Sequence, residues 1–254
     1  MQNQEQPARW CASIAAAGIT ALLTLSGTAA LAQDYDAIVA APDRSDADRA
    51  TDVRRMPAKM LAFTGVKTGM KVMDVEANAG YSSELLARAV GPTGTVYAQD
   101  SQALIDSLVK DKFDTRAQKP AMKNVVHIIR NFDDPIPPDV SNLDLITIFF
   151  SYHDITYMPV DRAAMNKKLF AALKPGGFFV VADHSARAGD GTSVAKTFHR
   201  IEESTLKSEV EAAGFKLVDE GDFLKHPEDP RDAAVFRPKV PVDEFVLKFQ
   251  KPGG

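Results

Sequence analysis

Cysteine is nearly absent from this sequence. Cys11 is the one cysteine among 254 residues, and it lies in an N-terminal segment that we expect to be removed. The expected mature chain therefore has no cysteine, which excludes structural disulfides, thiolate metal sites and a cysteine nucleophile. Its fold would depend on core packing alone.

Runs of basic residues, internal repeats and low-complexity tracts are also absent. The net charge is -4, from 30 Lys and Arg against 34 Asp and Glu. A nucleic-acid-binding domain usually carries a basic patch, so we expect no nucleic-acid partner and a small molecule as substrate. With 45% hydrophobic and 25% charged residues, the composition is that of an ordinary globular domain. Nothing in the sequence indicates an oligomeric state.

The first 32 residues differ from the rest of the chain. A polar stretch over residues 1–13 precedes small and apolar residues at 14–25, and Ala30 and Ala32 stand where a signal peptidase reads. These features are typical of a secretory signal peptide, so we predict cleavage after Ala32 and a periplasmic or secreted protein without stable membrane insertion. The alternative, an uncleaved membrane anchor, is disfavoured by the short apolar run.

Residues 72–100, VMDVEANAGYSSELLARAVGPTGTVYAQD, are the most informative stretch. An apolar run ends at Asp74, a turn of small residues leads into an amphipathic helix, and a second apolar run ends in Asp100. This order predicts a βαβ unit. Its first loop lies at the carboxyl edge of the sheet, where outward-facing N–H groups suit a nucleotide-like ligand.

The remaining residues alternate between helical and strand patterns. We predict a lead-in at 33–49 and one domain over 50–254. Apolar runs predict further strands at 125–129, 143–150, 178–182, 215–220 and 243–250. Helical spacing of apolar residues predicts helices at 50–64, 102–112, 161–173 and 194–213. In the first of these, Pro57 sits in the first turn or starts a second helical piece. The sequence thus predicts a doubly wound α/β fold, with a surface excursion at 221–240.

The βαβ unit resembles the first motif of the class I S-adenosylmethionine-dependent methyltransferases. That motif has an acid, three glycines at alternate positions and an acid ending the second strand. Asp74, Gly80 and Asp100 match it, whereas Glu76 and Asn78 stand where glycines are usual. Asn adopts a left-handed backbone fairly well and Glu does not, so the Glu76 side chain needs a place of its own.

A second match to this family is the sequence LKPGG at 173–177, between a helix and the fifth strand. The resemblance covers about Ala50 to Pro252. It implies a Rossmann-like seven-stranded, mostly parallel sheet with an antiparallel last strand and helices on both faces. In its altered glycines and its export signal, the chain is similar to a divergent exported branch of predicted bacterial methyltransferases.

The resemblance implies S-adenosylmethionine as cofactor and methyl transfer to a small-molecule or exported acceptor as activity. An acid at Asp100 would take the ribose hydroxyls, and Asp133 would contact the adenine amino group. Asp133 fits equally well as a turn acid before proline. The expected cofactor-binding residues are Asp74, Glu76, Asn78, Gly80, Asp100 and Asp133.

The candidate catalytic residues are His153, Asp154 and His184, which follow the apolar runs of the fourth and fifth strands. Methyl transfer requires an aligned acceptor and, for a hydroxyl, removal of a proton. A His titrating near neutral pH is the natural base, so we expect His153 or His184 in that role and Asp154 orienting the acceptor. The alternative for each His is a strand-end residue bonded to backbone.

Three other functions remain open at this stage. We expect no bound metal because no HxxxH or HExxH pattern occurs. A metal-dependent enzyme could nevertheless use His153, Asp154, His184 and His199, with Glu202 on the same predicted helix face as His199. A non-catalytic ligand-binding protein on the same fold is favoured by Glu76. A dehydrogenase is disfavoured by the Asp74 motif and by LKPGG.

Overall fold

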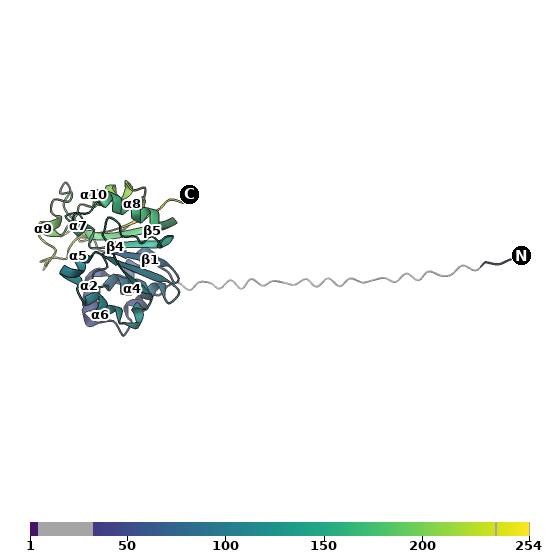
Figure 1. The fold of residues 1–254 in the computed structure, drawn as a ribbon. Coiled ribbons are helices and arrows are strands. Elements are labelled where there is room, and N and C mark those ends of the chain that lie inside the picture. Colours follow the sequence, from purple (N-terminus) through teal and green to yellow (C-terminus); the bar gives the residue numbers. More distant parts are fainter. Residues whose placement is uncertain (5–32, 237, 254) are drawn as a thin grey trace. The chain divides into compact units, whose positions relative to one another are not determined.

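The computed structural model describes residues 1–4, 33–236 and 238–253 (Figure 1). The chain divides into two units, Met1–Ala32 and Gln33–Gly254. The predicted signal peptide lies outside the described residues, apart from its first four, and its cleavage stays a prediction. No helix in the described ranges has the length and apolar character needed to cross a membrane.

The second unit is built on a seven-stranded sheet with the order β3-β2-β1-β4-β5-β7-β6. Strand β7 runs antiparallel to β5 and β6, and the other neighbouring strands are parallel. This confirms the predicted Rossmann-like sheet. The strands are β1 (Lys71–Val75), β2 (Thr95–Asp100), β3 (Val125–Ile129), β4 (Leu143–Phe149), β5 (Leu173–His184), β6 (Lys216–Gly221) and β7 (Glu244–Gln250).

Helices cover both faces of the sheet, with α8 and α10 on one side and α4 on the other (Figure 1). The longer helices are α2 (Asp46–Arg55), α3 (Pro57–Thr64), α4 (Tyr81–Val90), α8 (Arg162–Ala172) and α10 (Glu203–Glu211). The shorter ones are α1 (Tyr35–Val39), α5 (Gln102–Leu104), α6 (Lys112–Ala117), α7 (Tyr152–Ile155) and α9 (Ala195–Phe198), with a π-helical turn η1 (Ile105–Val109) and a 3-10 turn η2 (Pro120–Met122).

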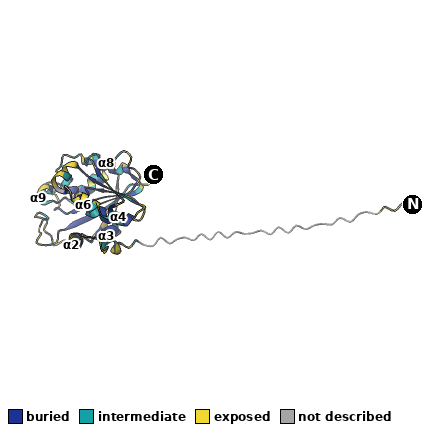
Figure 2. Ribbon diagram, turned by 60° about the horizontal axis from the view of Figure 1, so that its bottom comes forward, coloured by how far each residue is buried: buried dark blue, intermediate teal, exposed yellow. Residues whose placement is uncertain are grey.

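Side chains of each central strand alternate between two apolar cores. Along β1, Met73 and Val75 pack in the core beneath α8 and α10, whereas Val72 packs with Leu85 and Leu86 of α4. The strands accordingly form the buried centre of the unit (Figure 2). The acidic side chains of Asp74, Asp100 and Asp183 lie toward the carboxyl ends of β1, β2 and β5, where the site lies.

Two predicted helices are broken in the structure. The helix predicted at 50–64 divides at Met56, whose φ of 43° is left-handed, and Pro57 begins α3. Proline suits a first helical position because its missing N–H is not needed there. The helix predicted at 194–213 divides after α9, where His199 has a φ of 54°. The expectation that His199 and Glu202 share one helix face was therefore wrong.

Two smaller predictions also differ from the structure. The predicted helix at 102–112 is a single turn of α5 followed by the π-helical turn η1, and Lys110 ends it with a φ of 42°. The LKPGG residues lie within β5 rather than in a loop before it. Their pairing with β4 contains a register shift after Leu143, so the segment is extended but irregular.

Candidate functional site

The loop after β1 keeps the backbone shape of a glycine loop although it contains one glycine. Glu76, Asn78 and Gly80 have φ values of 56°, 55° and 77°. Glycine adopts this left-handed backbone at little cost in conformational energy. For a residue with a side chain, such as Glu76, the cost is higher by about 1–2 kcal/mol. The Asn78 side-chain amide bonds the Glu76 carbonyl at 2.9 Å and helps to hold the loop.

Asp74 lies beneath this loop. Its carboxylate accepts hydrogen bonds from the hydroxyls of Ser82 at 2.7 Å, Ser83 at 2.6 Å and Thr147 at 2.8 Å. Burial raises its pKa above the ordinary value. Asp74 therefore ties the start of α4 to β1 and β4, and it does not line either of the two cavities described below.

Asp100 is fully buried at the end of β2. One of its oxygens accepts the Asn78 N–H at 2.9 Å, and the other lies 3.0 Å from His127 Nε2. The His127 ring stacks on Phe113, with the ring centroids 3.8 Å apart. We call Asp100 and His127 the closed pair, because Phe113 covers it.

The cover continues over Gly80. A Cβ atom at Gly80 would lie 3.0 Å from the Arg116 side chain and 3.2 Å from Phe113, so α6 packs directly on the loop. Asp133 is half-buried in the turn after β3 and does not line either cavity. The structure thus leaves Asp74, Gly80, Asp100 and Asp133 outside the open part of the site, and their predicted roles stay predictions.

A cavity of about 330 Å³, the loop cavity, lies between this loop and α2. Glu76 Oε2 is buried there and has no hydrogen-bond partner among the described residues, and the same holds for Arg55 Nε. Burial raises the pKa of Glu76 well above its ordinary value, and the charge of Asp154 adds to the rise. Burial, together with the charge of Arg54, lowers the pKa of Arg55 to about 10.

A second cavity, the histidine cavity, has a volume of about 520 Å³ and shares Arg55, Phe150 and Asp154 with the loop cavity. The two cavities therefore adjoin at the carboxyl ends of β1 and β4, where the strand order reverses and α/β sheets bind ligands. Its lining consists of Arg54, Arg55, Phe150, His153, Asp154, His184, His199, Val235, Phe236 and Pro238.

His153 and Asp183 form what we call the open pair. Asp183 Oδ1 lies 2.6 Å from His153 Nδ1, and Asp183 Oδ2 accepts the His153 backbone N–H at 2.8 Å. His153 Nε2 is 3.1 Å from Asp154 Oδ1 and 3.2 Å from His199 Nδ1. Burial alone would lower the pKa of His153, but the charges and hydrogen bonds of Asp183 and Asp154 outweigh burial and raise it to about 10.

His184 differs from His153 although both follow apolar strands. Its ring is buried, with Nδ1 2.9 Å from Glu244 Oε1, and burial lowers its pKa to about 3 despite the nearby charge of Asp183. His184 is therefore neutral near pH 7 and binds a proton too weakly for a good base. Of the two candidate bases, His153 alone has a strongly raised pKa.

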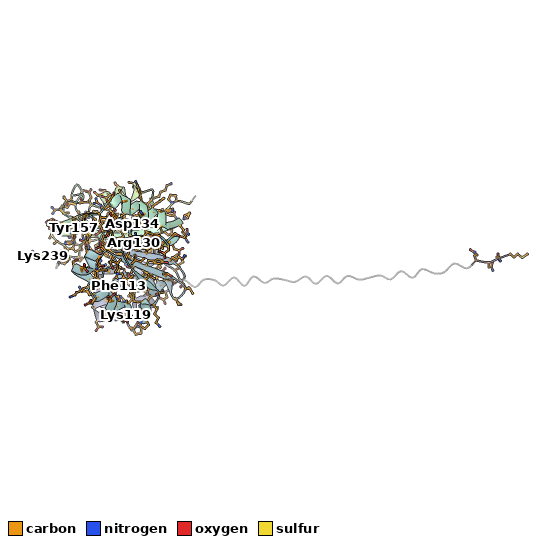
Figure 3. The ribbon with its side chains drawn as sticks, viewed as in Figure 1. Phe113, Lys119, Arg130, Asp134, Tyr157 and Lys239 are labelled. Carbon is orange, nitrogen blue, oxygen red and sulfur yellow. The ribbon has the colours of Figure 1, made fainter. Side chains whose placement is uncertain are left out.

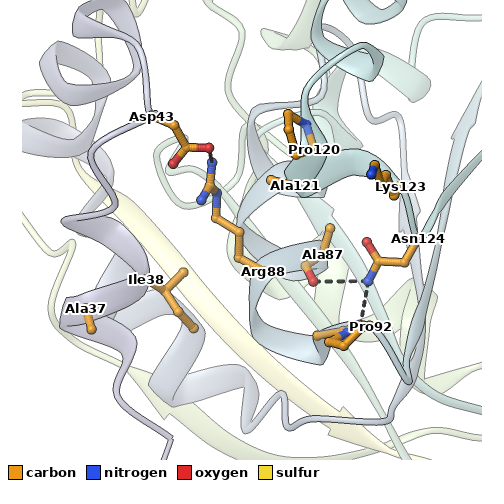
Figure 4. A pocket seen from close by; sticks show the side chains of 11 residues that line it. Ala37, Ile38, Asp43, Ala87, Arg88, Pro92, Pro120, Ala121, Lys123 and Asn124 are labelled. Atoms are coloured by element: carbon orange, nitrogen blue, oxygen red, sulfur yellow. Dashed lines mark hydrogen bonds and ion pairs between the residues drawn. The ribbon is translucent and has the colours of Figure 1, made fainter.

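The largest cavity described, about 720 Å³, is drawn in Figure 4 and shares no lining residue with the loop cavity or the histidine cavity. It is open and bounded by α1, α4 and the segment after η2. Its polar contacts are the ion pair of Arg88 with Asp43 and the hydrogen bonds of Asn124 to Ala87 and Gly91. These contacts are structural, so we place no chemistry there.

Five predicted residues thus meet at the adjoining cavities: Glu76, Asn78, His153, Asp154 and His184. Sequence reasoning missed Arg55 and Phe236. The Arg54-Arg55 pair before Met56-Pro57 was a signal for Arg55, because a charged pair at a helix end suggests an interface with a ligand or another element. Nothing in the sequence marked Phe236, which reaches the site from the excursion between β6 and β7.

Comparison with known families gives one clear match. The model of the ubiE/COQ5 methyltransferase family matches residues 52–200, more than half of the chain. A ubiquinone/menaquinone biosynthesis C-methyltransferase from Idiomarina loihiensis is 26% identical over 184 residues, 61% of this chain and 70% of the relative. One from Shewanella halifaxensis is 31% identical over 125 residues, 49% of this chain and 47% of the relative.

Solved structures agree on the fold. A SAM dependent methyltransferase from Aquifex aeolicus superposes with a TM-score of 0.57 at 20% identity, covering 82% of this chain and 99% of that one. A sarcosine dimethylglycine methyltransferase homologue from Galdieria sulphuraria gives a TM-score of 0.58 at 15% identity, over 80% of this chain and 86% of the other. The chain belongs to the ubiE/COQ5 methyltransferase family, and it is an S-adenosylmethionine-dependent methyltransferase.

Proposed function

We propose that this enzyme methylates a small aromatic hydroxyl compound held in the histidine cavity. The observation that carries the proposal is the open pair, in which His153 Nε2 meets Asp154 and His199 at the cavity wall. Phe150 and Phe236 line the same cavity, and the Phe236 ring lies 4.7 Å from that of His199. Rings of this kind favour an aromatic acceptor.

The residues of the loop cavity fit the methionine end of the cofactor. S-adenosylmethionine supplies an activated methyl group on a sulfonium. Its amino-acid tail carries a carboxylate and an ammonium group. Arg55 would bind the tail's carboxylate and Glu76 its ammonium, because each has a buried polar atom without a partner among the described residues. At the other end, Asp100 would reach a ribose only after His127 and Phe113 move aside.

Two neighbouring groups would act on the acceptor. With a pKa of about 10, His153 is protonated near neutral pH and would donate an N–H to the acceptor oxygen, stabilising it as an anion. Asp154 Oδ1, 3.1 Å from His153 Nε2, would accept a hydrogen bond from the acceptor hydroxyl and orient it. Burial alone would raise the pKa of Asp154, but the hydrogen bond and charge of His153 outweigh burial and lower it, so the proton itself would pass to water. This arrangement changes the expected role of His153 from base to electrostatic stabiliser.

The test is release of S-adenosylhomocysteine by the purified chain from S-adenosylmethionine and a panel of hydroquinones, catechols and monophenols. Hydroquinones lead the panel because the named relatives are C-methyltransferases of ubiquinone and menaquinone biosynthesis. We expect turnover with at least one hydroxyl class, and mass and NMR analysis would assign the methyl group to carbon or oxygen. No turnover with any member of the panel by a folded chain that binds S-adenosylmethionine would contradict the proposal.

We also propose that the enzyme is exported and cleaved after Ala32. Support comes from the apolar run at 14–25 and the small residues Ala30 and Ala32. Expression in a Gram-negative host, fractionation and N-terminal sequencing test this. A periplasmic product beginning at Gln33 is expected, and a cytoplasmic product that retains residues 1–32 would contradict it.

A further inference from the structure

Three ligand-type atoms converge at the wall of the histidine cavity. His153 Nε2, Asp154 Oδ1 and His199 Nδ1 lie 3.1 Å, 3.2 Å and 3.0 Å apart, pair by pair, and so form a nearly equilateral triangle. A proton on each ring nitrogen could bond Asp154 Oδ1, but the two imidazole nitrogens would then face each other at 3.2 Å with an N–H on each. A shared cation satisfies the three atoms together.

The triangle has the dimensions of a metal-binding face. Ligand atoms about 3 Å apart can all lie roughly 2.0–2.2 Å from an ion just above their plane, the usual distance for imidazole and carboxylate ligands. Two His and one carboxylate on one face are a ligand set of non-haem iron sites, and they also suit zinc or manganese.

The surrounding residues hold the three ligands in place. Asp183 accepts a hydrogen bond from His153 Nδ1 at 2.6 Å, which leaves the Nε2 lone pair for a cation. The hydroxyl of Tyr157 (labelled in Figure 3) donates a hydrogen bond to Asp154 Oδ1. His199 is brought to the site by the left-handed turn that ends α9.

The same three residues line the histidine cavity. We propose that His153, Asp154 and His199 bind one divalent transition-metal ion whose remaining positions are open to an oxygen of the bound molecule. The proposal goes beyond methyl transfer and does not depend on it. With the ion bound, His153 would be a metal ligand. The ion, instead of the His153 N–H, would then stabilise an acceptor oxygen as an anion.

The test is binding of Co²⁺ and Zn²⁺ to the chelator-treated full chain, purified without a His tag. Equilibrium dialysis and the visible absorption of Co²⁺ are the readouts, and neither depends on catalysis. We expect one equivalent to bind, and Asp183→Asn to weaken binding about 10–100-fold through the His153 ring. The matched control is His226→Ala, because His226 lies outside the cluster beside Glu228.

Two ligand variants decide the outcome. His199→Asn keeps a residue that tolerates the left-handed backbone, and Asp154→Asn keeps the side-chain shape. Each is expected to weaken Co²⁺ binding at least a hundredfold while thermal unfolding monitored by circular dichroism shows an intact fold. Less than about a tenth of an equivalent bound to the natural chain, or binding that survives His199→Asn, would overturn the proposal.

Discussion

The closed pair and the open pair are the same chemical unit in two settings. Asp100 with His127 and Asp183 with His153 each join a buried strand-end carboxylate to an imidazole, at 3.0 Å and 2.6 Å. His127 then stacks on Phe113, whereas the second nitrogen of His153 meets Asp154 and His199. One pair is covered and the other lines a cavity.

This difference shows that packing by neighbouring side chains, rather than residue type, decides which strand end is accessible to a ligand. At the closed pair, α6 brings Phe113 and Arg116 over the loop, and Arg116 bonds Asp48 and Glu84 through both terminal nitrogens. At the open pair, the segment that crosses the site is the excursion carrying Val235 and Phe236, which leaves the histidine cavity beneath it.

The largest expected effect comes from removing the cover of the closed pair. Phe113 is buried and stacked on His127, so Phe113→Ala should lower the free energy of unfolding by about 3–5 kcal/mol. The same change should tighten binding of S-adenosylhomocysteine, because the adenosyl group no longer has to displace the ring. Urea unfolding and calorimetry measure the two effects. Weaker binding by a folded Phe113→Ala protein would show that the ring supports the ligand instead.

Next in size is the effect of each His on catalysis. His153→Ala should lower kcat about 10²–10³-fold, because the donor that stabilises the acceptor oxygen is lost. The matched variant His127→Ala should lower kcat less than tenfold. Initial rates of S-adenosylhomocysteine release with saturating acceptor decide this. Equal losses in the two variants would remove the distinction between the pairs.

A third effect concerns pH and the ion pair of Asp48 with Arg116, which we call the clamp because Arg116 lies over the loop beside the closed pair. Burial alone would raise the pKa of Asp48, but its bonds to Arg116 outweigh burial and lower the pKa from 3.8 to about 2. Because the folded-state pKa is depressed, the stabilisation is present above pH 3.8 and is lost as pH falls through about 2. We expect Asp48→Asn to cost about 2 kcal/mol at neutral pH and progressively less below pH 3.8.

Urea unfolding of both proteins between pH 2 and pH 7 measures this difference. Glu203→Gln is a suitable comparison, since the Glu203 carboxylate pairs with Lys207 and Lys225 far from the clamp. A difference between natural and Asp48→Asn protein that stays constant over the whole pH range would contradict the assignment.

The smallest effect is expected at the loop itself. Glu76→Gly removes a left-handed non-glycine residue and a buried carboxylate without a partner, so it should raise the free energy of unfolding by about 1 kcal/mol. It should also weaken S-adenosylmethionine binding, because the partner of the ammonium is lost. Thermal unfolding and calorimetry test the two together. Tighter binding by Glu76→Gly would mean that Glu76 blocks the cofactor site.

The strands along the chain were predictable from the sequence, because buried parallel strands leave continuous apolar runs such as LDLITIFF at 143–150. The mostly parallel sheet was implied by the family resemblance. The left-handed backbones of Met56 and His199 were not predictable, because only tertiary packing selects them.

The same limit applies to the site. His153 and Asp154 could be placed at a strand end, but the approach of His199 from 46 residues away depends on the turn after α9. The burial of Asp100 depends on Phe113, a side chain of α6 whose packing on His127 no local pattern encodes. Sequence motifs located the loop, and packing decided which of its residues are exposed.

The most direct test of this account is calorimetric titration of the purified chain with S-adenosylmethionine, beside its Arg55→Met variant. The account predicts one saturable site for the natural chain and at least tenfold weaker binding for Arg55→Met, since Arg55 lines the loop cavity with its Nε unpartnered among the described residues. Equal affinities for the two proteins, or no heat with the natural chain, would contradict it.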